Sequence, residues 1–230
     1  SRSGQHPRSF LGHGGERAWK GRLVCDDYSG YKALFLGGGI TEVGCMAHAR
    51  RKFVELHLAN KSMLAATAIE FIGQLYGIER EVKSLALEER LRERRTRAAP
   101  LAQALHGWLV EFRAKVPDGS ASARAMDYSL HRWDALTRYL GDAALPIDNN
   151  FDEQQIRPWA TGRKNWLFAG TLLAGQRAAA IMSLIQTAKL NGHDPYAYLR
   201  DVLTRLPTHK NSDLGDLLPH RWMPSRAMAY

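Results

Sequence analysis

The sequence predicts a mixed α+β protein in which helices make up most of the fold. Two short apolar runs, residues 22–26 and 40–46, have the length and composition of buried strands. From residue 59 to residue 140 the chain instead repeats its apolar residues at helical spacing, and β-branched runs are almost absent. Further helical patterns follow residue 147. We therefore expect a small strand-containing part and a much larger helical part.

The first 58 residues are expected to hold both strands. Residues 1–21 are rich in Gly, Arg and His without periodicity, which indicates a loop-like segment. The first strand ends in Asp26 and Asp27, and in open α/β sheets active sites gather at that edge. A short helix is expected at 28–35. The second strand leads into a helix that carries Arg50, Arg51 and Lys52, which face either solvent or the phosphates of a nucleic acid.

Residues 59–146 are expected to form a helical region. Residues 78–97 alternate Glu and Arg, which is typical of an exposed helix laced by ion pairs three and four residues apart. Pro100 is expected to start the next helix, over residues 101–116, because proline is favoured in the first turn. A third pattern, at 122–140, has its apolar residues at core spacing and predicts one continuous helix.

The stretch from Asp148 to Pro158 has two interpretations. Asn150 and Glu153 have the spacing of a capping box, in which each side chain accepts from a backbone amide of the other residue. Alternatively, Glu153 supplies one carboxylate of a metal site from the first turn of a helix. Beyond it we expect a basic turn and a strand-like run at 161–170. A helix at 175–190 should end at Gly192, a last helix should occupy 196–205, and the tail should contain one anchoring patch.

The composition favours a polyanionic partner and a reducing environment. Thirty-two Lys and Arg residues stand against 23 Asp and Glu residues, giving a formal net charge of +9. No apolar run reaches the length of a membrane-spanning helix, and the first residues do not resemble a secretory signal. Cys25 and Cys45, with His48, could be imagined as zinc ligands. Without a second paired motif, buried thiols are the preferred interpretation.

Several longer motifs resemble one family of mobile-element enzymes. They are residues 24–31 (VCDDYSGY), 41–53 (TEVGCMAHARRKF), 147–150 with Glu153 and 156–158, 162–170 (GRKNWLFAG), 183–199 and 201–207. Together they resemble the transposase of the bacterial insertion sequence 66 family, from about residue 22 to residue 222. An acid at a strand edge, a second strand, a helix and a late helix opening with Glu also follow the order of metal-binding carboxylates in nucleases and transposases of the RNase H-like fold.

The resemblance implies a fold and a chemistry. Residues 22–58 and 147–206 would form an incomplete RNase H-like core with few strands, residues 59–146 a large helical insertion, and residues 207–230 a tail. The activity would be DNA transposition by a DDE-type transposase, with metal-dependent strand cleavage and transfer. Asp26 matches the family's second Asp and Glu153 its Glu, and together they would help to hold two Mg²⁺ or Mn²⁺ ions. Asp27 stands where the family often has Gly.

The resemblance also implies that one catalytic residue is missing from the chain, and it implies a set of partners. No residue corresponds to the family's first catalytic Asp, so the chain is expected to be the C-terminal part of such a transposase and inactive alone. The alternative is a non-catalytic remnant that binds DNA or another transposase. Expected partners are transposon ends and target DNA, a second copy on DNA and accessory proteins of the element, in the bacterial cytoplasm at the nucleoid. The residues expected to face phosphate are Arg50, Arg51, Lys52, Arg157, Arg163 and Lys164.

Overall fold

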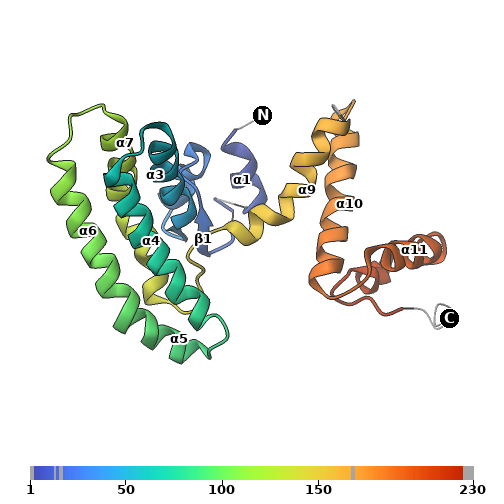
Figure 1. The fold of residues 1–230 in the computed structure, drawn as a ribbon. Helices are drawn as coiled ribbons and strands as arrows, with labels where there is room; N and C mark the ends of the chain where they lie inside the picture. The colour runs from blue at the N-terminus through green and yellow to red at the C-terminus, as the bar shows by residue number, and fades with distance from the viewer. Residues whose placement is uncertain (1–2, 13, 16–17, 167–168, 225–230) are drawn as a thin grey trace. The chain divides into compact units, whose positions relative to one another are not determined.

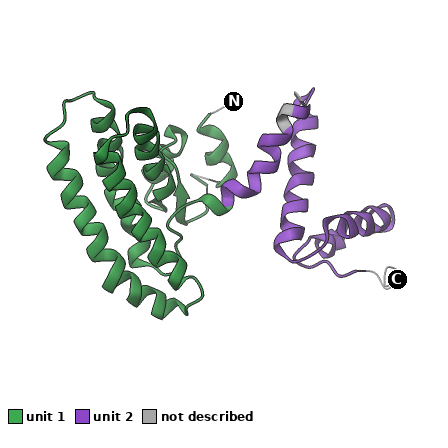
Figure 2. Ribbon diagram, viewed as in Figure 1, with its two compact units in different colours: residues 1–151 green, residues 152–230 purple. Residues whose placement is uncertain are grey.

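The computed structural model describes residues 3–12, 14–15, 18–166 and 169–224, with the backbone alone at positions 163, 164 and 166 (Figure 1). The chain divides into two compact units, Ser1–Phe151 and Asp152–Tyr230 (Figure 2), and each is described by itself. Helices predominate, and the strands of the described ranges form a two-stranded sheet in the first unit. The prediction of a mostly helical α+β protein is confirmed. Within these ranges, no helix combines the length and the apolar character needed to cross a membrane.

The sheet of the first unit consists of β1 (Gly21–Cys25) and β2 (Ile40–Gly44), which run parallel with Cys25 opposite Gly44. The connection between them contains the 3₁₀ turn η1 (Ser29–Tyr31) and the short helix α2 (Lys32–Phe35). Both predicted strands and the short helix are confirmed. Because the strands are parallel, the residues that follow them meet at the same edge of the sheet, and these residues are Asp26 and Cys45.

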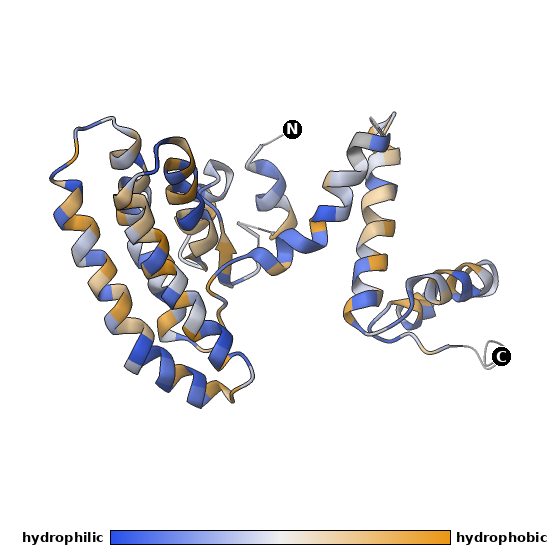
Figure 3. Ribbon diagram, viewed as in Figure 1, coloured by the Kyte–Doolittle hydropathy of each residue, from blue (hydrophilic) through white to orange (hydrophobic). Residues whose placement is uncertain are grey.

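Most of the first unit is a group of packed helices (Figure 1). They are α3 (Met46–Asn60), α4 (Met63–Val82), α5 (Leu87–Glu93), the π-helical turn η2 (Arg94–Ala98), α6 (Ala99–Arg113), α7 (Ala121–His131), α8 (Trp133–Thr137) and the 3₁₀ turn η3 (Arg138–Gly141). Hydrophobic and hydrophilic residues alternate along α4 and α6, as expected for helices with one packed face (Figure 3). The core takes Val43 from the sheet, and Phe53, Ile72, Leu105 and Met126 from four different helices.

A glycine lets a helix pack closely on the sheet. A Cβ atom placed on Gly44 would lie 2.9 Å from the backbone nitrogen of Leu136, in α8. No side chain fits at that distance without a shift of the backbone. Gly44 therefore fixes how closely α8 can approach β2, and with it the position of the chain just before α8.

Three expectations for the first unit are wrong in detail. The expected N-terminal loop contains a short helix, α1 (Gln5–Phe10). The expected exposed helix at 78–97 is broken between Val82 and Leu87, and its Arg94 is buried, although the ion pairs Arg92–Glu89 and Arg97–Glu93 do lace its surface. Finally, the expected helix at 122–140 is interrupted at Arg132.

Pro100 lies in the first turn of α6, as predicted, although α5, η2 and α6 follow one another without a break. Proline has no N–H to donate, and its ring crowds the preceding turn of an α-helix. The π-helical turn at Arg94–Ala98 lies directly before it and shifts the hydrogen-bond register. This turn accommodates Pro100 at the start of α6, within the longer helical run.

The second unit is helical and has its own small core. It contains nearly all of α9 (Asn150–Trp166), then α10 (Leu172–Leu190), α11 (Pro195–Arg205) and the 3₁₀ turns η4 (Leu206–Thr208) and η5 (Asn211–Leu217). Gly192 follows α10 with φ of 77°, and the Asp194 side chain accepts from the Ala197 amide at 2.7 Å, so both predicted helix boundaries are confirmed.

The tail is anchored to this core as predicted. The core residues are Ala188, Tyr198, Val202, Leu217 and Trp222. The Trp222 ring packs edge-on against Tyr198, and its Nε1 donates to Asp201 at 2.7 Å. The basic turn expected at 161–166 is wrong, because α9 continues to Trp166 although Pro158 lies inside it. The strand-like run expected next includes residues 167 and 168, which lie outside the described residues.

Candidate functional site

Asp26 lies directly after β1, at the carboxyl edge of the sheet, and is half-buried. Its Oδ1 accepts a hydrogen bond from the Tyr28 amide at 3.1 Å, and its carbonyl oxygen accepts one from Nη2 of Arg132 at 3.3 Å. Among the described residues, none donates a hydrogen bond to its Oδ2. The carboxylate is therefore held by the backbone on one side and keeps one oxygen for a cation.

The neighbouring acids at this edge are already paired. Oδ1 of Asp27 accepts from Nζ of Lys32 at 2.5 Å and from Nη1 of Arg132 at 2.6 Å. Glu42, on β2, places Oε1 2.8 Å from Nη2 of Arg132. Burial acts to raise the pKa of Asp27, but the hydrogen bonds and charges of Lys32 and Arg132 outweigh it and hold that pKa below its usual value. Asp27 and Glu42 are thus neutralised by protein cations, whereas Asp26 is not.

The cysteines at this edge are buried thiols. Burial, and then the charge of Glu42, raises the pKa of Cys25 to about 12. Burial likewise raises the pKa of Cys45. Zinc binds the thiolate form, so this environment opposes the alternative of Cys25, Cys45 and His48 as zinc ligands. Within the described ranges, no three His, Cys, Asp or Glu side chains form a group that could hold a metal ion.

The start of α9 is capped by Asp148. Its Oδ1 accepts from the Asn150 amide at 3.0 Å, and its Oδ2 accepts from Nδ2 of Asn150 at 2.7 Å and from the Tyr76 hydroxyl at 2.6 Å. The helix starts at Asn150, where the sequence predicted its start, and Asp148 holds the backbone amide of that residue. Tyr76, on α4, fixes the Asp148 carboxylate in this position through its hydroxyl group. Glu153 lies in the first turn of α9 and is half-buried.

The two predicted metal ligands fall in different units. Asp26 belongs to Ser1–Phe151 and Glu153 to Asp152–Tyr230. Both offer the hard oxygen ligands that Mg²⁺ and Mn²⁺ prefer. The open Oδ2 of Asp26 fits such an ion.

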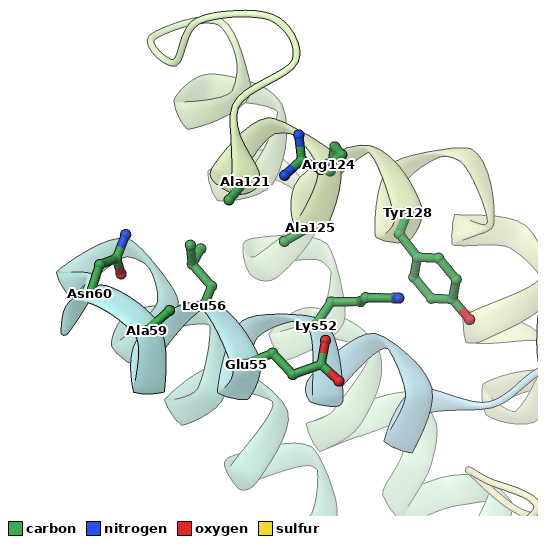
Figure 4. A pocket seen from close by; sticks show the side chains of 9 residues that line it. All are labelled: Lys52, Glu55, Leu56, Ala59, Asn60, Ala121, Arg124, Ala125 and Tyr128. Carbon is green, nitrogen blue, oxygen red and sulfur yellow. The ribbon is translucent and has the colours of Figure 1, made fainter.

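The predicted basic residues on α3 are exposed. Arg50, Arg51 and Lys52 are consecutive residues of α3 whose side chains point in different directions around the helix, and all three are exposed. Lys52 reaches toward the ring of Tyr128, with Nζ 5.8 Å from its centre (Figure 4). It lines a hollow of about 470 Å³ between α3 and α7, to which Glu55 and Arg124 also contribute. This surface can therefore approach a phosphate backbone, with both charged and aromatic groups.

The other predicted phosphate contacts lie on α9. Arg157 is exposed there. Arg163 and Lys164 belong to the same helix, but their side chains lie outside the described residues.

Comparison with known proteins identifies the family. Residues 1–177 match the model of the Transposase IS66 family, and residues 183–220 match the model of the IS66 C-terminal element. The chain belongs to the IS66 transposase family. The resemblance seen in the sequence motifs is thereby confirmed.

Curated relatives of this IS66-family chain include three proteins of Sinorhizobium fredii (strain NBRC 101917 / NGR234). The uncharacterized protein y4hP is 36% identical over 243 residues, covering 98% of this chain and 43% of its own length. The uncharacterized proteins y4jD and y4qI are each 35% identical, covering 89% and 90% of this chain and 42% and 40% of their own lengths. The chain thus spans about two fifths of the length of these relatives. No solved structure matches it.

Two residues of the IS66-family chain that contact the site were missed from sequence. The sequence patterns single out neither Arg132 nor Tyr76, and both lie in stretches with helical spacing. A signal existed for Arg132, because it lies three residues after Ser129 and four before Leu136, both of which are buried. An arginine on a buried face requires acidic partners. For Tyr76 no local signal existed, since its partner lies 72 residues away in the sequence.

Proposed function

We propose that this IS66-family chain acts in DNA transposition as the C-terminal region of a DDE-type transposase. In this proposal Asp26 and Glu153 each supply a carboxylate to metal-dependent strand cleavage and transfer. The observation that carries it is the placement of Asp26 directly after the first of two parallel strands, with one carboxylate oxygen open. Family membership over residues 1–177 supports the same chemistry.

The proposed domain organisation follows the same interpretation. Residues 22–58 and 147–206 would belong to an RNase H-like core, and residues 59–146 to a helical insertion. The parallel pairing of β1 and β2, followed by α3, supports this assignment, as does the uninterrupted run of helices from α4 to η3. The segments 1–21 and 207–230 would flank the core.

Divalent ions, when bound, would activate the attacking oxygen and stabilise the leaving oxygen of the phosphodiester. The chain's own residues would perform the remaining tasks. The Tyr28 amide orients the Asp26 carboxylate. The Asp148 cap fixes the point at which α9 begins, three residues before Glu153. Exposed Arg50, Arg51 and Lys52 on α3, with Arg157, Arg163 and Lys164 on α9, would hold the phosphate backbone.

We propose further that the third acid of the site comes from sequence outside residues 1–230. In the motif resemblance no residue of this chain corresponds to the family's first Asp, and the relatives are more than twice as long as the region they share with it. Without that ligand the metal site would be incomplete. The chain alone is therefore expected to bind DNA but not to transfer strands.

The test is strand transfer of labelled transposon ends in Mg²⁺, by this chain and by the same chain joined to the N-terminal portion of an IS66-family relative. Asp26→Asn and Glu153→Gln should each abolish the activity of the joined protein, because each removes a metal-binding oxygen. Asp134→Asn changes an exposed acid of α8 in the same way and should leave it intact. Activity that persists in Asp26→Asn or Glu153→Gln would refute the assignment of that residue.

A non-catalytic role in DNA binding is the second candidate, and the exposed cluster on α3 favours it. It predicts that the joined protein binds DNA but transfers no strands. In that case Asp26→Asn and Glu153→Gln would leave DNA binding unchanged. The strand-transfer measurement above separates the two candidates.

A further inference from the structure

Arg132 is a buried arginine that joins the helical part of the first unit to both strands of the sheet. Its side chain is 5% exposed. One nitrogen donates to Asp27 at 2.6 Å, and the other donates to the Asp26 carbonyl at 3.3 Å and pairs with Glu42 at 2.8 Å. The guanidinium carbon also lies 5.7 Å from the centre of the Tyr128 ring. One side chain thus contacts the residues after β1, a residue of β2 and a residue of α7.

The backbone around Arg132 is adapted to this position. Periodicity predicts one helix through this point, yet α7 ends at His131 and α8 begins at Trp133. Arg132 has φ of −112° and ψ of 14°, and its carbonyl accepts from the Leu136 amide at 2.9 Å. The interruption removes helical hydrogen bonds, and the ion pairs of Arg132 must offset the free energy that this loss costs. Burying a guanidinium is costly unless its charge is compensated, and here two carboxylates compensate it.

We propose that Arg132 is a positioning residue for Asp26, and that Asp27 and Glu42 serve as its anchors and not as metal ligands. The inference rests on the proposed function of Asp26. The contact to the Asp26 carbonyl fixes the backbone that carries the carboxylate, and the Tyr28 amide fixes its Oδ1. Because Arg132 and Lys32 occupy the neighbouring acids, a cation at this edge meets one open carboxylate, that of Asp26.

This arrangement requires arginine and not simply a positive charge. The planar guanidinium presents several donors in a fixed fork, so it can reach three acceptors at once. A lysine carries one nitrogen on a flexible stem and cannot reproduce that geometry. Arg132→Lys should therefore keep the charge balance with Asp27 and Glu42 but lose most of the positioning of Asp26.

A matched control exists in the same unit. Arg94 is 1% exposed, pairs with Glu79 and donates to two backbone carbonyls, but it contacts no residue of the Asp26 edge. Arg94→Met should therefore lower global stability without a specific effect on Asp26. Arg132→Met and Arg132→Lys should affect Asp26 beyond any global change.

The first measurement is amide hydrogen exchange of Tyr28, whose N–H donates to Asp26, in the whole chain by NMR. After correction for global unfolding, protection of this amide should be lost in Arg132→Met and reduced in Arg132→Lys. It should be retained in Arg94→Met. Equal protection of the Tyr28 amide in Arg132→Met and Arg94→Met would overturn the proposal, since it would leave Arg132 only a general structural role.

The second measurement is Mn²⁺ binding to the chain, followed by electron paramagnetic resonance. Partners behind metal ligands typically contribute ten- to a hundredfold to metal affinity, so Arg132→Lys, which keeps Asp27 and Glu42 paired with a cation, should weaken Mn²⁺ binding by at least about tenfold. Asp26→Asn should weaken it as well, and Arg94→Met should not. Weakened binding in Asp26→Asn beside unchanged binding in Arg132→Lys would overturn the role of Arg132 alone. Unchanged binding in Asp26→Asn would instead overturn the proposed role of Asp26.

Discussion

Removal of the positive charges on α3 gives a quantitative test of the proposed DNA surface. The change is the triple substitution of Arg50, Arg51 and Lys52 by Gln, all at exposed positions. Successive helical residues turn by about 100°, so Arg50 and Lys52 point about 200° apart and cannot both face one duplex. We therefore expect one or two of the three side chains to contact phosphate. Each lost contact should reduce the magnitude of the slope of the logarithm of the association constant against the logarithm of the salt concentration by about 0.9. At 0.1 M salt, this corresponds to binding that is weaker by about eightfold.

The assay is fluorescence anisotropy with a labelled duplex at several salt concentrations. A control triple substitution, Arg92→Gln, Arg95→Gln and Arg97→Gln, removes the same number of charges from an exposed surface of α5 and η2. If α3 contacts DNA, its substitution lowers the salt slope by about 0.9 to 1.8, and the control changes it little. Equal changes in both proteins would show that overall charge governs binding, and would refute the assignment of the surface to α3.

Three further predictions concern stability. Arg94→Met leaves the Glu79 carboxylate, whose side chain is 13% exposed, without its ion pair and should lower the free energy of unfolding by about 3–5 kcal/mol in urea denaturation. Replacing Glu79 by Leu in the same protein should restore part of the lost free energy of unfolding. The absence of any recovery would contradict the pairing of Arg94 with Glu79. The Tyr139 hydroxyl is buried without a hydrogen-bond partner among the described residues, so Tyr139→Phe should stabilise the protein by about 1 kcal/mol.

Burial, and then the charge of Glu79, also raises the pKa of Tyr139. The stability contributed by its protonated form is complete below about pH 10 and declines above it by up to about 1.4 kcal/mol per pH unit, a loss that the Phe variant should not share. In the second unit, Trp222→Leu removes a hydrogen bond to Asp201 and two ring contacts. Hydrogen exchange should accelerate in α11 but not in β1 and β2, and equal acceleration in both units would contradict separate cores.

Much of the fold is predictable from the sequence, because many helix ends and strands depend on residues that are close together in the chain. Asp194 and Gly192 mark helix ends through their own side chain or backbone freedom, and both positions were predictable. The strand before Asp26 was recognisable from its apolar run. In contrast, the burial of Arg94 depends on Glu79, which precedes it by 15 residues, and on carbonyls more than 40 residues away.

The same distinction applies to the candidate site. The position of Asp26 at a sheet edge follows from the strand that ends before it. The environment of its carboxylate depends on Arg132, 106 residues along the chain, whose helix break the periodicity could not predict. Similarly, the Asp148 cap depends on a tyrosine 72 residues earlier. Residue spacing indicates which acids could bind a metal ion. Long-range packing decides which of these carboxylates are paired with a protein cation and which remain available to the metal.

The hydrogen bond between Tyr76 and Asp148 has a practical consequence for protein engineering. Under the proposed domain organisation, residues 59–146 would be the natural segment to delete in a shortened version of this protein. Yet Tyr76 belongs to α4 of that segment and holds the carboxylate that caps α9. Arg132, in the same segment, holds the backbone of Asp26. A minimised version would therefore have to replace both contacts, and a plain linker would leave the two acid-bearing segments without their supports.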